Sequence, residues 1–322
     1  MRVLITGAAG YIGRQLLHKL ALQQPHWQLF AADIQMLAPQ SLPANVQAMQ
    51  LDISNPAAVR QCVAQSQAQA IVHLASVVTP PPGMSAAQLH AIDVGGTQTV
   101  IEAALAHGVQ QLIVTSSGAA YGYHPQNALW LDEQQPLRGH PHFAYAKHKC
   151  EVEQLLAHAR KQHPQLKQLI LRPGTILGAQ VNNQISALFK DRAVLGVRGS
   201  DSRFVFIWDE DVLDIIIQGL REHSSGIYNL AGDGALSLRQ VAKLLAKPYV
   251  ALPAWLIRSV LAVLKPLGLS PYGPEQVDFL RYRPVLSNQR LKQDFAYTPR
   301  YNSKQAFLAF LDAQGIAHQA EA

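Results

Sequence analysis

Three glycines spaced three residues apart lie in the stretch TGAAGYIG, directly after the apolar run RVLI at residues 2–5. The residues that follow have helical spacing, so the glycines lie between a strand and a helix. Gly7 permits a tight turn, Gly10 lets a diphosphate approach the backbone, and Gly13 lets the helix pack closely on the sheet. The N-terminus of the helix adds unpaired N–H groups and a positive dipole end. This pattern predicts a dinucleotide-binding loop, and it constrains the fold more than any other feature.

Short apolar runs alternate with longer segments of helical spacing over the first half of the chain. The runs predict strands at 2–6, 28–33, 46–51, 70–75, 111–116 and 168–173, and the segments between them predict helices at 13–23, 56–65, 84–107 and 145–162. Strands that alternate with helices form βαβ units, whose right-handed crossovers build a parallel sheet covered on both faces. The predicted fold class is therefore α/β, with a Rossmann-type doubly wound parallel sheet.

The character of the chain changes after Pro173, where turn-rich segments begin. One more buried strand is predicted in GIYNLAG at 226–232. We therefore expect an NAD-binding Rossmann domain built from 1–173 and 204–232. A smaller C-terminal, substrate-binding lobe is expected from 174–203 and 233–322.

The composition narrows the classes of partner. The net charge of +6 indicates an anionic partner, but the basic residues are scattered, which argues against nucleic acid and is compatible with the phosphates of a cofactor. The 13 histidines include no helical His-x-x-x-His pair and no cysteine cluster, so no metal site is predicted. Only two cysteines are present and no export signal opens the chain, so we expect a reducing, cytoplasmic compartment.

The most apolar segment, LPAWLIRSVLAVLKPLGL at 252–269, is interrupted by Arg258, Lys265 and Pro266. It is shorter than a membrane span needs, so no integral membrane segment is predicted. The favoured interpretation is a buried or pocket-lining helix, in which Trp255 contacts the substrate. A helix on a membrane surface, or a lid over an apolar substrate, is the alternative.

Asp33 ends the run LFAAD, 20 residues after Gly13. A carboxylate at this position accepts hydrogen bonds from the adenosine ribose hydroxyls and repels a ribose phosphate. It therefore favours NAD over NADP, a preference that Arg14 would soften. The alternative is a solvated turn residue.

The stretch YAKHK presents Tyr145 with two lysines downstream of it. Residues four apart share a helix face and residues two apart do not, so Lys149, and not Lys147, can approach the Tyr145 hydroxyl. Taken alone, the pattern also fits an exposed helix with a solvated lysine. Cys150, next to Lys149, is interpreted as a small residue on a packed helix face rather than as a reactive thiol.

Together these segments resemble the extended short-chain dehydrogenase/reductases, the NAD-dependent epimerase/dehydratase family. The resemblance covers most of the chain and is strongest over 1–180. The matching segments, in chain order, are TGAAGYIG, LDIS (51–54), HLAS (73–76), VTSSGAAYG (114–122), YAKHK, LRPGTILG (171–178), FVFIWDEDV (204–212) and GIYNLAG.

The resemblance implies a set of roles. Tyr145 is expected to be the base, Lys149 its partner and a ligand of the nicotinamide ribose, and Ser117, rather than Ser116, the hydroxyl that orients the substrate oxygen. The residues implied to contact NAD are Gly7, Gly10, Tyr11, Ile12, Gly13, Asp33, Asp52, Ile53, Leu74, Ala75, Ser76, Tyr145, Lys149 and Pro173.

Departures from the family's pattern bear on the substrate. Asp93 stands where many members have asparagine, which predicts different hydrogen bonding around Lys149. The Arg-Asp pair that nucleotide-sugar members carry before the FVFIW position is absent, whereas Asn183 matches a position that contacts a sugar nucleotide's diphosphate. Diphosphate recognition therefore stays open at this point.

We expect an NAD-dependent enzyme that transfers hydride at a secondary alcohol or ketone of a small molecule, as a net dehydrogenase/reductase or within an epimerase. A nucleotide-sugar epimerase or dehydratase is the alternative. A non-catalytic NAD-binding sensor or assembly subunit is a third, but such relatives typically lose the tyrosine or the lysine, and both are present here. The resemblance also implies a homodimer packed through two helices.

Overall fold

The computed structural model describes residues 1–38, 40, 42–181, 192–270 and 273–319. The chain divides into two compact units. Unit 1 comprises Met1–Ala120, His148–Arg172 and Glu210–Tyr228, and unit 2 comprises Tyr121–Lys147, Pro173–Asp209 and Asn229–Ala322. The assignment of NAD binding to 1–173 plus 204–232, and of substrate binding to 174–203 plus 233–322, stays a prediction.

A seven-stranded sheet organises unit 1, with the order β11-β6-β5-β4-β1-β2-β3. Its strands are β1 (Arg2–Thr6), β2 (Gln28–Asp33), β3 (Val46–Gln50), β4 (Ala70–His73), β5 (Gln111–Thr115), β6 (Lys167–Pro173) and β11 (Gly226–Leu230). Every strand pair from β6 across to β3 is parallel. The chain winds outward from β1 to β3 and then returns to β4 on the other side of β1, which confirms the predicted doubly wound fold.

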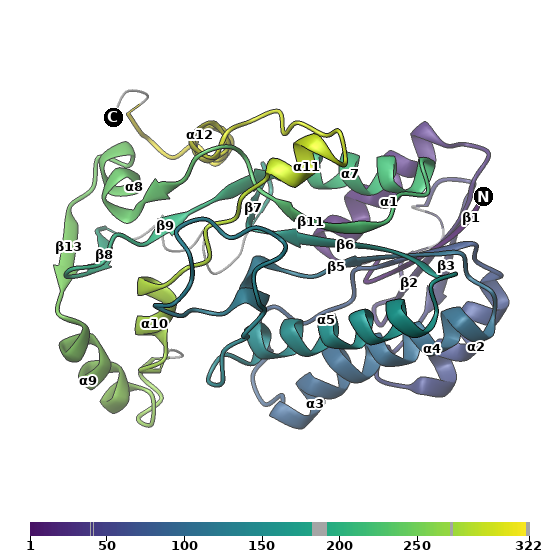
Figure 1. Cartoon of the computed structure of the whole chain (residues 1–322), viewed down its shortest axis with the longest axis horizontal. Helices are drawn as coiled ribbons and strands as arrows, with labels where there is room; N and C mark the ends of the chain where they lie inside the picture. Colours follow the sequence, from purple (N-terminus) through teal and green to yellow (C-terminus); the bar gives the residue numbers. More distant parts are fainter. Residues whose placement is uncertain (39, 41, 182–191, 271–272, 320–322) are drawn as a thin grey trace. The chain divides into compact units, whose positions relative to one another are not determined.

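Helices cover both faces of this sheet (Figure 1). One face carries α1 (Tyr11–Gln23) and α7 (Asp209–Arg221), and the other carries α2 (Pro56–Ser66), α3 (Ala86–His90), α4 (Gly96–Ala106) and α5 (Ala144–Gln162). The second face buries an apolar cluster that includes Val63 of α2, Ile101 of α4 and Leu156 of α5. The helix predicted over 84–107 is interrupted by a π-helical segment, η2 (Ala91–Gly95), between α3 and α4.

The described part of unit 2 contains three two-stranded sheets: β7 (Thr175–Leu177) with β10 (Phe206–Trp208), β9 (Arg203–Phe204) with β12 (Leu236–Ser237), and β8 (Val194–Val197) with β13 (Tyr249–Leu252). The helices described there include α8 (Leu238–Leu244), α9 (Ala254–Leu264), α10 (Gln276–Arg281), α11 (Gln289–Gln293) and α12 (Ser303–Ala313). Stacked rings of Phe204, Phe206 and Phe307, with centroids 5.9 and 5.4 Å apart, join β9, β10 and α12. A separate apolar cluster of Val197, Ile257, Val277 and Leu280 joins β8, α9 and α10.

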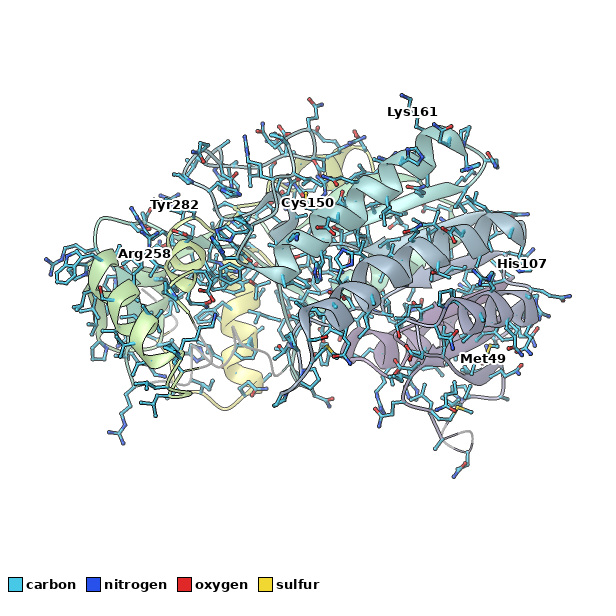
Figure 2. The ribbon with its side chains drawn as sticks, turned by 90° about the horizontal axis from the view of Figure 1, so that it is seen from below. Met49, His107, Cys150, Lys161, Arg258 and Tyr282 are labelled. Carbon is cyan, nitrogen blue, oxygen red and sulfur yellow. The ribbon has the colours of Figure 1, made fainter. Side chains whose placement is uncertain are left out.

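Helix α9 is not buried, which corrects one part of the interpretation of 252–269; that the segment lines a substrate pocket stays a prediction. Within α9 only Ile257 is buried, whereas Trp255 is 69% exposed, and Leu269 beyond the helix is 71% exposed. Two ion pairs connect the segment to the neighbourhood of α10: Arg258, labelled in Figure 2, with Asp278, and Lys265 with Glu275. Ile257 packs into an apolar cluster with Val277 and Leu280 of α10. This cluster covers only one side of the helix, so the apolar residues on the other side stay exposed.

No helix in the described part of the chain is both long and apolar enough to cross a lipid bilayer.

Candidate active site

The glycine loop between β1 and α1 has the geometry that its sequence predicts. Gly7 has φ +71°, and a Cβ there would lie 2.6 Å from the backbone nitrogen of Ala75. A Cβ on Gly13 would collide with the carbonyl oxygen of Gly7. Helix α1 begins at Tyr11 with Gly10 as its cap residue, so no side chain caps the helix N-terminus. The loop therefore combines a close backbone approach with a bare helix N-terminus, which fits a bound diphosphate.

Asp33 lies at the carboxyl end of β2 beside this loop. Its Oδ2 accepts a hydrogen bond from the backbone N–H of Ala9 (2.9 Å), and its Oδ1 accepts one from that of Gln35 (2.9 Å). The half-buried carboxylate is thus held against the glycine loop instead of extending into solvent from a turn.

Asp52 and Ile53, at the end of β3, differ in surroundings. Asp52 is exposed, and its Oδ1 accepts hydrogen bonds from the backbone N–H and the hydroxyl of Ser54, at 2.8 and 2.6 Å. Ile53 is 7% exposed and packs against Gly96 at the start of α4. Ile53 is therefore part of the core, while the Asp52 carboxylate stabilises the local turn through its hydrogen bonds with Ser54.

The turn after β4 contains Leu74, Ala75 and Ser76, all half-buried. The backbone N–H of Leu74 donates to the carbonyl of Thr6 at 3.1 Å, and Ala75 faces Gly7. The structure thus brings this turn next to the glycine loop, at the point where the strand order reverses. Clefts at such points bind ligands in open α/β sheets.

Helix α5 carries both Tyr145 and Lys149 in its first turns. Tyr145 is half-buried, Lys147 is exposed, and Lys149 is buried at 6% exposure. The Lys149 ammonium donates a 3.0 Å hydrogen bond to the carbonyl oxygen of Thr115, the last residue of β5. Burial lowers the pKa of Lys149, whereas the charges of Asp93 and Glu153 raise it. The two lysines of YAKHK thus differ in environment as helix geometry predicts.

The two serines after β5 have separate partners. Ser116 is 2% exposed, and its hydroxyl donates to Glu153 Oε1 at 2.6 Å, while Glu153 also accepts two hydrogen bonds from Arg172 at 2.6 and 2.7 Å. Ser117 is half-buried and its Oγ accepts from the backbone N–H of Ala119 at 3.1 Å. Because Ser116 is part of a buried ionic network, Ser117 is the better candidate to face a substrate.

A buried carboxylate lies between the 74–77 turn and α5. Asp93 of η2, 3% exposed, accepts hydrogen bonds at Oδ1 from the Ser76 hydroxyl (3.0 Å) and the Val77 N–H (2.9 Å). Its Oδ2 lies 3.0 Å from Nδ1 of His148, which is 4% exposed. From Asp93 the sequence predicted a different hydrogen-bonding pattern here, but it did not predict His148 as a partner. The only sequence signal for His148 is that it directly precedes Lys149.

Sequence reasoning also missed Arg283 in unit 2. Its guanidinium stacks on the rings of Phe204 and Phe279, at 4.0 and 4.4 Å from their centroids, and Nη2 donates to the Thr175 hydroxyl at 3.2 Å. Its Nη1 is buried and finds no hydrogen-bond partner in the part of the chain that the structure describes. Burial lowers the pKa of Arg283 to about 10. Within the described residues no carboxylate lies within ion-pair distance of it, so this cation is suited to an anionic ligand.

The remaining predicted residues are scattered. Pro173 is buried at the end of β6, and Asn183 lies outside the described residues. Trp255 of α9 is 69% exposed, and its contact with a substrate stays a prediction. Cys150, labelled on α5 in Figure 2, is buried, and burial together with nearby glutamates raises the pKa of its thiol. That environment is typical of an inert packed cysteine.

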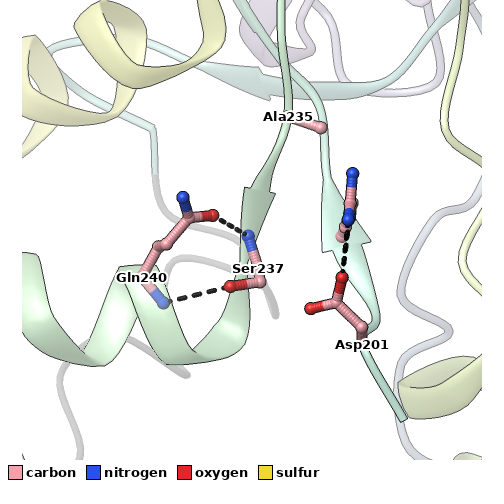
Figure 3. Close-up of a pocket in the computed structure, with 5 residues that line it drawn as sticks. Asp201, Ala235, Ser237 and Gln240 are labelled. Carbon is pink, nitrogen blue, oxygen red and sulfur yellow. Dashed lines mark hydrogen bonds and ion pairs between the residues drawn. The ribbon is translucent and has the colours of Figure 1, made fainter.

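A shallow hollow in unit 2 is shown in Figure 3, lined by Asp201, Arg203, Ala235, Ser237 and Gln240. Arg203 pairs with Asp201, and Ser237 and Gln240 form the capping box of α8. The polar groups satisfy one another, so the hollow suggests no chemistry. No cluster of three metal-ligating side chains occurs among the residues that the structure describes.

The parallel sheet, the glycine loop after its first strand and the acidic residue ending its second define a Rossmann-type dinucleotide-binding class of protein. Residues 3–231 match the model of the NAD dependent epimerase/dehydratase family, and the chain belongs to this family.

Solved structures with a similar fold include the enzyme WbmG of Bordetella bronchiseptica in complex with NAD and UDP, with a TM-score of 0.74, 18% identity, and coverage of 98% of this chain and 94% of that one. UDP-glucose 4-epimerase of Thermotoga maritima with UDP-glucose has a TM-score of 0.74, 16% identity, and coverage of 98% and 99%. An uncharacterised protein of Mycobacterium tuberculosis is 21% identical over 319 residues, covering 98% of this chain and 84% of that protein.

Proposed function

We propose that this protein is an NAD-dependent enzyme that transfers hydride at a secondary alcohol or ketone of a small molecule, with Tyr145 as the base. The observation that carries the proposal is the buried ammonium of Lys149, anchored on Thr115 and placed one helical turn after Tyr145. A surface lysine would serve the helix equally well, so burial of this cation at a cost in desolvation points to a chemical role.

In this proposal Tyr145 transfers the proton and Lys149 makes that transfer easier. An ordinary tyrosine has a pKa of about 10 and is a poor base at neutral pH. The Lys149 ammonium on the same helix face favours the phenolate, so Tyr145 can take the proton of a substrate hydroxyl. Ser117 orients the substrate oxygen, while Ser116 stabilises the fold through Glu153.

The glycine loop fits NAD. Gly7, Gly10 and Gly13 would hold its diphosphate, Asp33 its adenosine ribose, and Lys149 its nicotinamide ribose; the bound nicotinamide supplies the hydride acceptor. Several structural neighbours were crystallised with NAD, including dTDP-glucose 4,6-dehydratase of Bacillus anthracis, with a TM-score of 0.72 and 17% identity. The position of the Asp33 carboxylate against the loop supports NAD over NADP.

A nucleotide-sugar epimerase or dehydratase is the second candidate, and Arg283 favours it. A buried guanidinium without a carboxylate partner is costly unless a ligand supplies the negative charge. A substrate with a phosphate or carboxylate group would supply it. The retained tyrosine and lysine argue against a purely non-catalytic sensor.

The experiment is an assay of the purified protein with NAD against two panels, one of nucleotide sugars and one of uncharged secondary alcohols and ketones. Net redox chemistry is followed by NADH absorbance, and epimerisation by chromatography of the products. Turnover in either panel supports the enzyme, and Arg283→Met should raise KM only for anionic substrates. Tight NAD binding with no turnover of any substrate, equally in wild type and Tyr145→Phe, would favour the sensor.

A further inference from the structure

An apolar surface on helix α9 of unit 2 has no cover among the residues that the structure describes. Its large apolar side chains are between 46% and 71% exposed, and we call them the α9 surface: Trp255, Val260 and Val263 of the helix, and Leu267 and Leu269 directly after it. Strand β13 leads into this helix (Figure 1). On β13, Val250 is also exposed and is the direct ladder partner of the exposed Leu195 of β8.

Helix α9 is apolar on its outward side as well as on its inward side. Ile257 points inward, to the apolar cluster with α10. Successive residues of a helix are rotated by about 100°, so Trp255, Ala262 and Val263 lie on the opposite side, and all three are exposed. Ser259 is the polar residue among them. A surface helix normally has charged or polar residues on its outward side, and a helix that is apolar all round is normally covered.

The two cations of the segment lie on one flank of the helix. Arg258 and Lys265 are seven residues, or about two turns, apart. Arg258 pairs with Asp278 of α10, and Lys265 pairs with Glu275 directly before α10, both at 2.7 Å. Because both partners belong to the α10 side, these charges are held beside the outward side of α9 and do not interrupt it.

The chain around α9 is basic. Residues 234–274 contain five lysines or arginines and no aspartate or glutamate, although the whole chain has 27 basic and 21 acidic residues. Arg239 and Lys243 of α8 are exposed. Arg198, also exposed, follows β8, and its backbone N–H donates to the carbonyl of Leu252 just before α9 at 2.8 Å. An apolar surface in basic surroundings is complementary to a partner that is apolar inside and negatively charged outside.

We propose that the α9 surface binds an anionic lipid bilayer, with the helix parallel to the membrane plane. The outward side of α9 enters the boundary between head groups and acyl chains, where tryptophan side chains such as Trp255 are favoured, and the basic residues around it face the anionic head groups. A second copy of the chain is a poorer occupant, because two surfaces of the same positive charge would meet. This interaction is separate from the reaction proposed at Tyr145 and adds a place of action to it.

The test uses the full-length protein and two kinds of vesicle, one of phosphatidylcholine alone and one of phosphatidylcholine with an equal part of phosphatidylglycerol. At low salt we expect co-sedimentation with the anionic vesicles to be at least about 10-fold stronger than with the neutral ones, and to weaken as salt screens the charges. The emission of Trp255, identified by its loss in Trp255→Phe, should shift to the blue and be quenched by lipids that carry bromine on their acyl chains.

A pair of matched variants locates the contact. Val263→Asp places a charge on the outward side of α9 and should weaken vesicle binding by at least about 10-fold, because apolar burial at this position is lost. Leu129→Asp makes the same change in charge at a residue outside the α9 surface that is 63% exposed, and it should leave binding unchanged. Both positions are exposed, so both variants should fold, which circular dichroism verifies.

Failure of the folded wild-type protein to bind anionic vesicles would overturn the proposal, as would equal binding by wild type and Val263→Asp. Sedimentation velocity without lipid tests the other occupant: a wild-type dimer that Val263→Asp dissociates would assign the α9 surface to a second copy instead. None of these measurements needs NAD, substrate or turnover. Their outcome is therefore distinct from that of the activity assay.

Discussion

The Lys149 ammonium and the Thr115 carbonyl oxygen lie 3.0 Å apart, so a helix and the end of a central strand are joined at one buried cation. Thr115 ends β5 and directly precedes the two serines, whereas Lys149 follows Tyr145 by one turn of α5. This hydrogen bond sets the direction of the lysine side chain and makes the lysine variants the most informative ones.

Lys149→Ala should impair both turnover and NAD affinity, because in the proposed function the ammonium assists the Tyr145 phenolate and holds the cofactor ribose. Lys147→Ala should do little, since Lys147 is exposed and lies off the Tyr145 face. Steady-state kinetics and NAD titration by fluorescence compare the two. Greater damage from the Lys147 change would contradict the assignment of Lys149.

Tyr145→Phe should lower kcat by about 10²–10⁴-fold, as expected for loss of a general acid/base, with NAD affinity retained. The change removes one hydroxyl and keeps the ring, so the fold should survive, which circular dichroism can verify. Retention of full activity would eliminate Tyr145 as the base.

The two adjacent serines should separate function from stability. Ser117→Ala should lower turnover with the melting temperature nearly unchanged. Ser116→Ala removes a buried donor to Glu153 and should cost about 1–3 kcal/mol of unfolding free energy. Denaturant unfolding and kinetics on both variants check this, and the opposite pattern would exchange their roles.

Asp33→Ala should weaken NAD binding by about 10- to 100-fold, the value of a lost charge-assisted hydrogen bond. NADP binding should weaken less or improve, because a carboxylate that repels the ribose phosphate is removed. Fluorescence titration with both cofactors measures the ratio. Equal affinities in the wild-type protein would contradict the role assigned to Asp33.

Stability should fall as the pH is lowered from about 6.5 toward 3, partly because of His73. This histidine is 3% exposed between Thr6 and Thr97, and burial, followed by the charge of Lys149, lowers its pKa to about 3. Between these pH values the unfolded chain binds a proton that the native state does not, at up to about 1.4 kcal/mol per pH unit.

His73→Gln should flatten this part of the stability curve, measured by urea unfolding at several pH values. His26→Gln, at an exposed position, serves as the matched control. An unaltered slope in His73→Gln would show that other groups dominate acid unfolding.

The sequence by itself determined the features that depend on short spacing along the chain. The strands of the parallel sheet, the glycine loop and the helical phase of Tyr145 and Lys149 are local patterns, and the structure has the predicted strands with ends that differ by at most two residues. Glycine conformation and helix geometry act between near neighbours, so no tertiary knowledge is needed to predict them.

Tertiary structure alone decided which polar side chains already have hydrogen-bond partners within the protein. Ser116 and Ser117 are adjacent, yet only Ser116 meets Glu153, 37 positions away. Asp93 and His148 are 55 positions apart. Arg283 is distinguished by its buried Nη1, which has no hydrogen-bond partner among the described residues. The exposure of α9 is of the same kind, because apolar residues become buried only where another element covers them. Burial and pairing depend on residues that the fold brings together, and that is why sequence spacing does not reveal them.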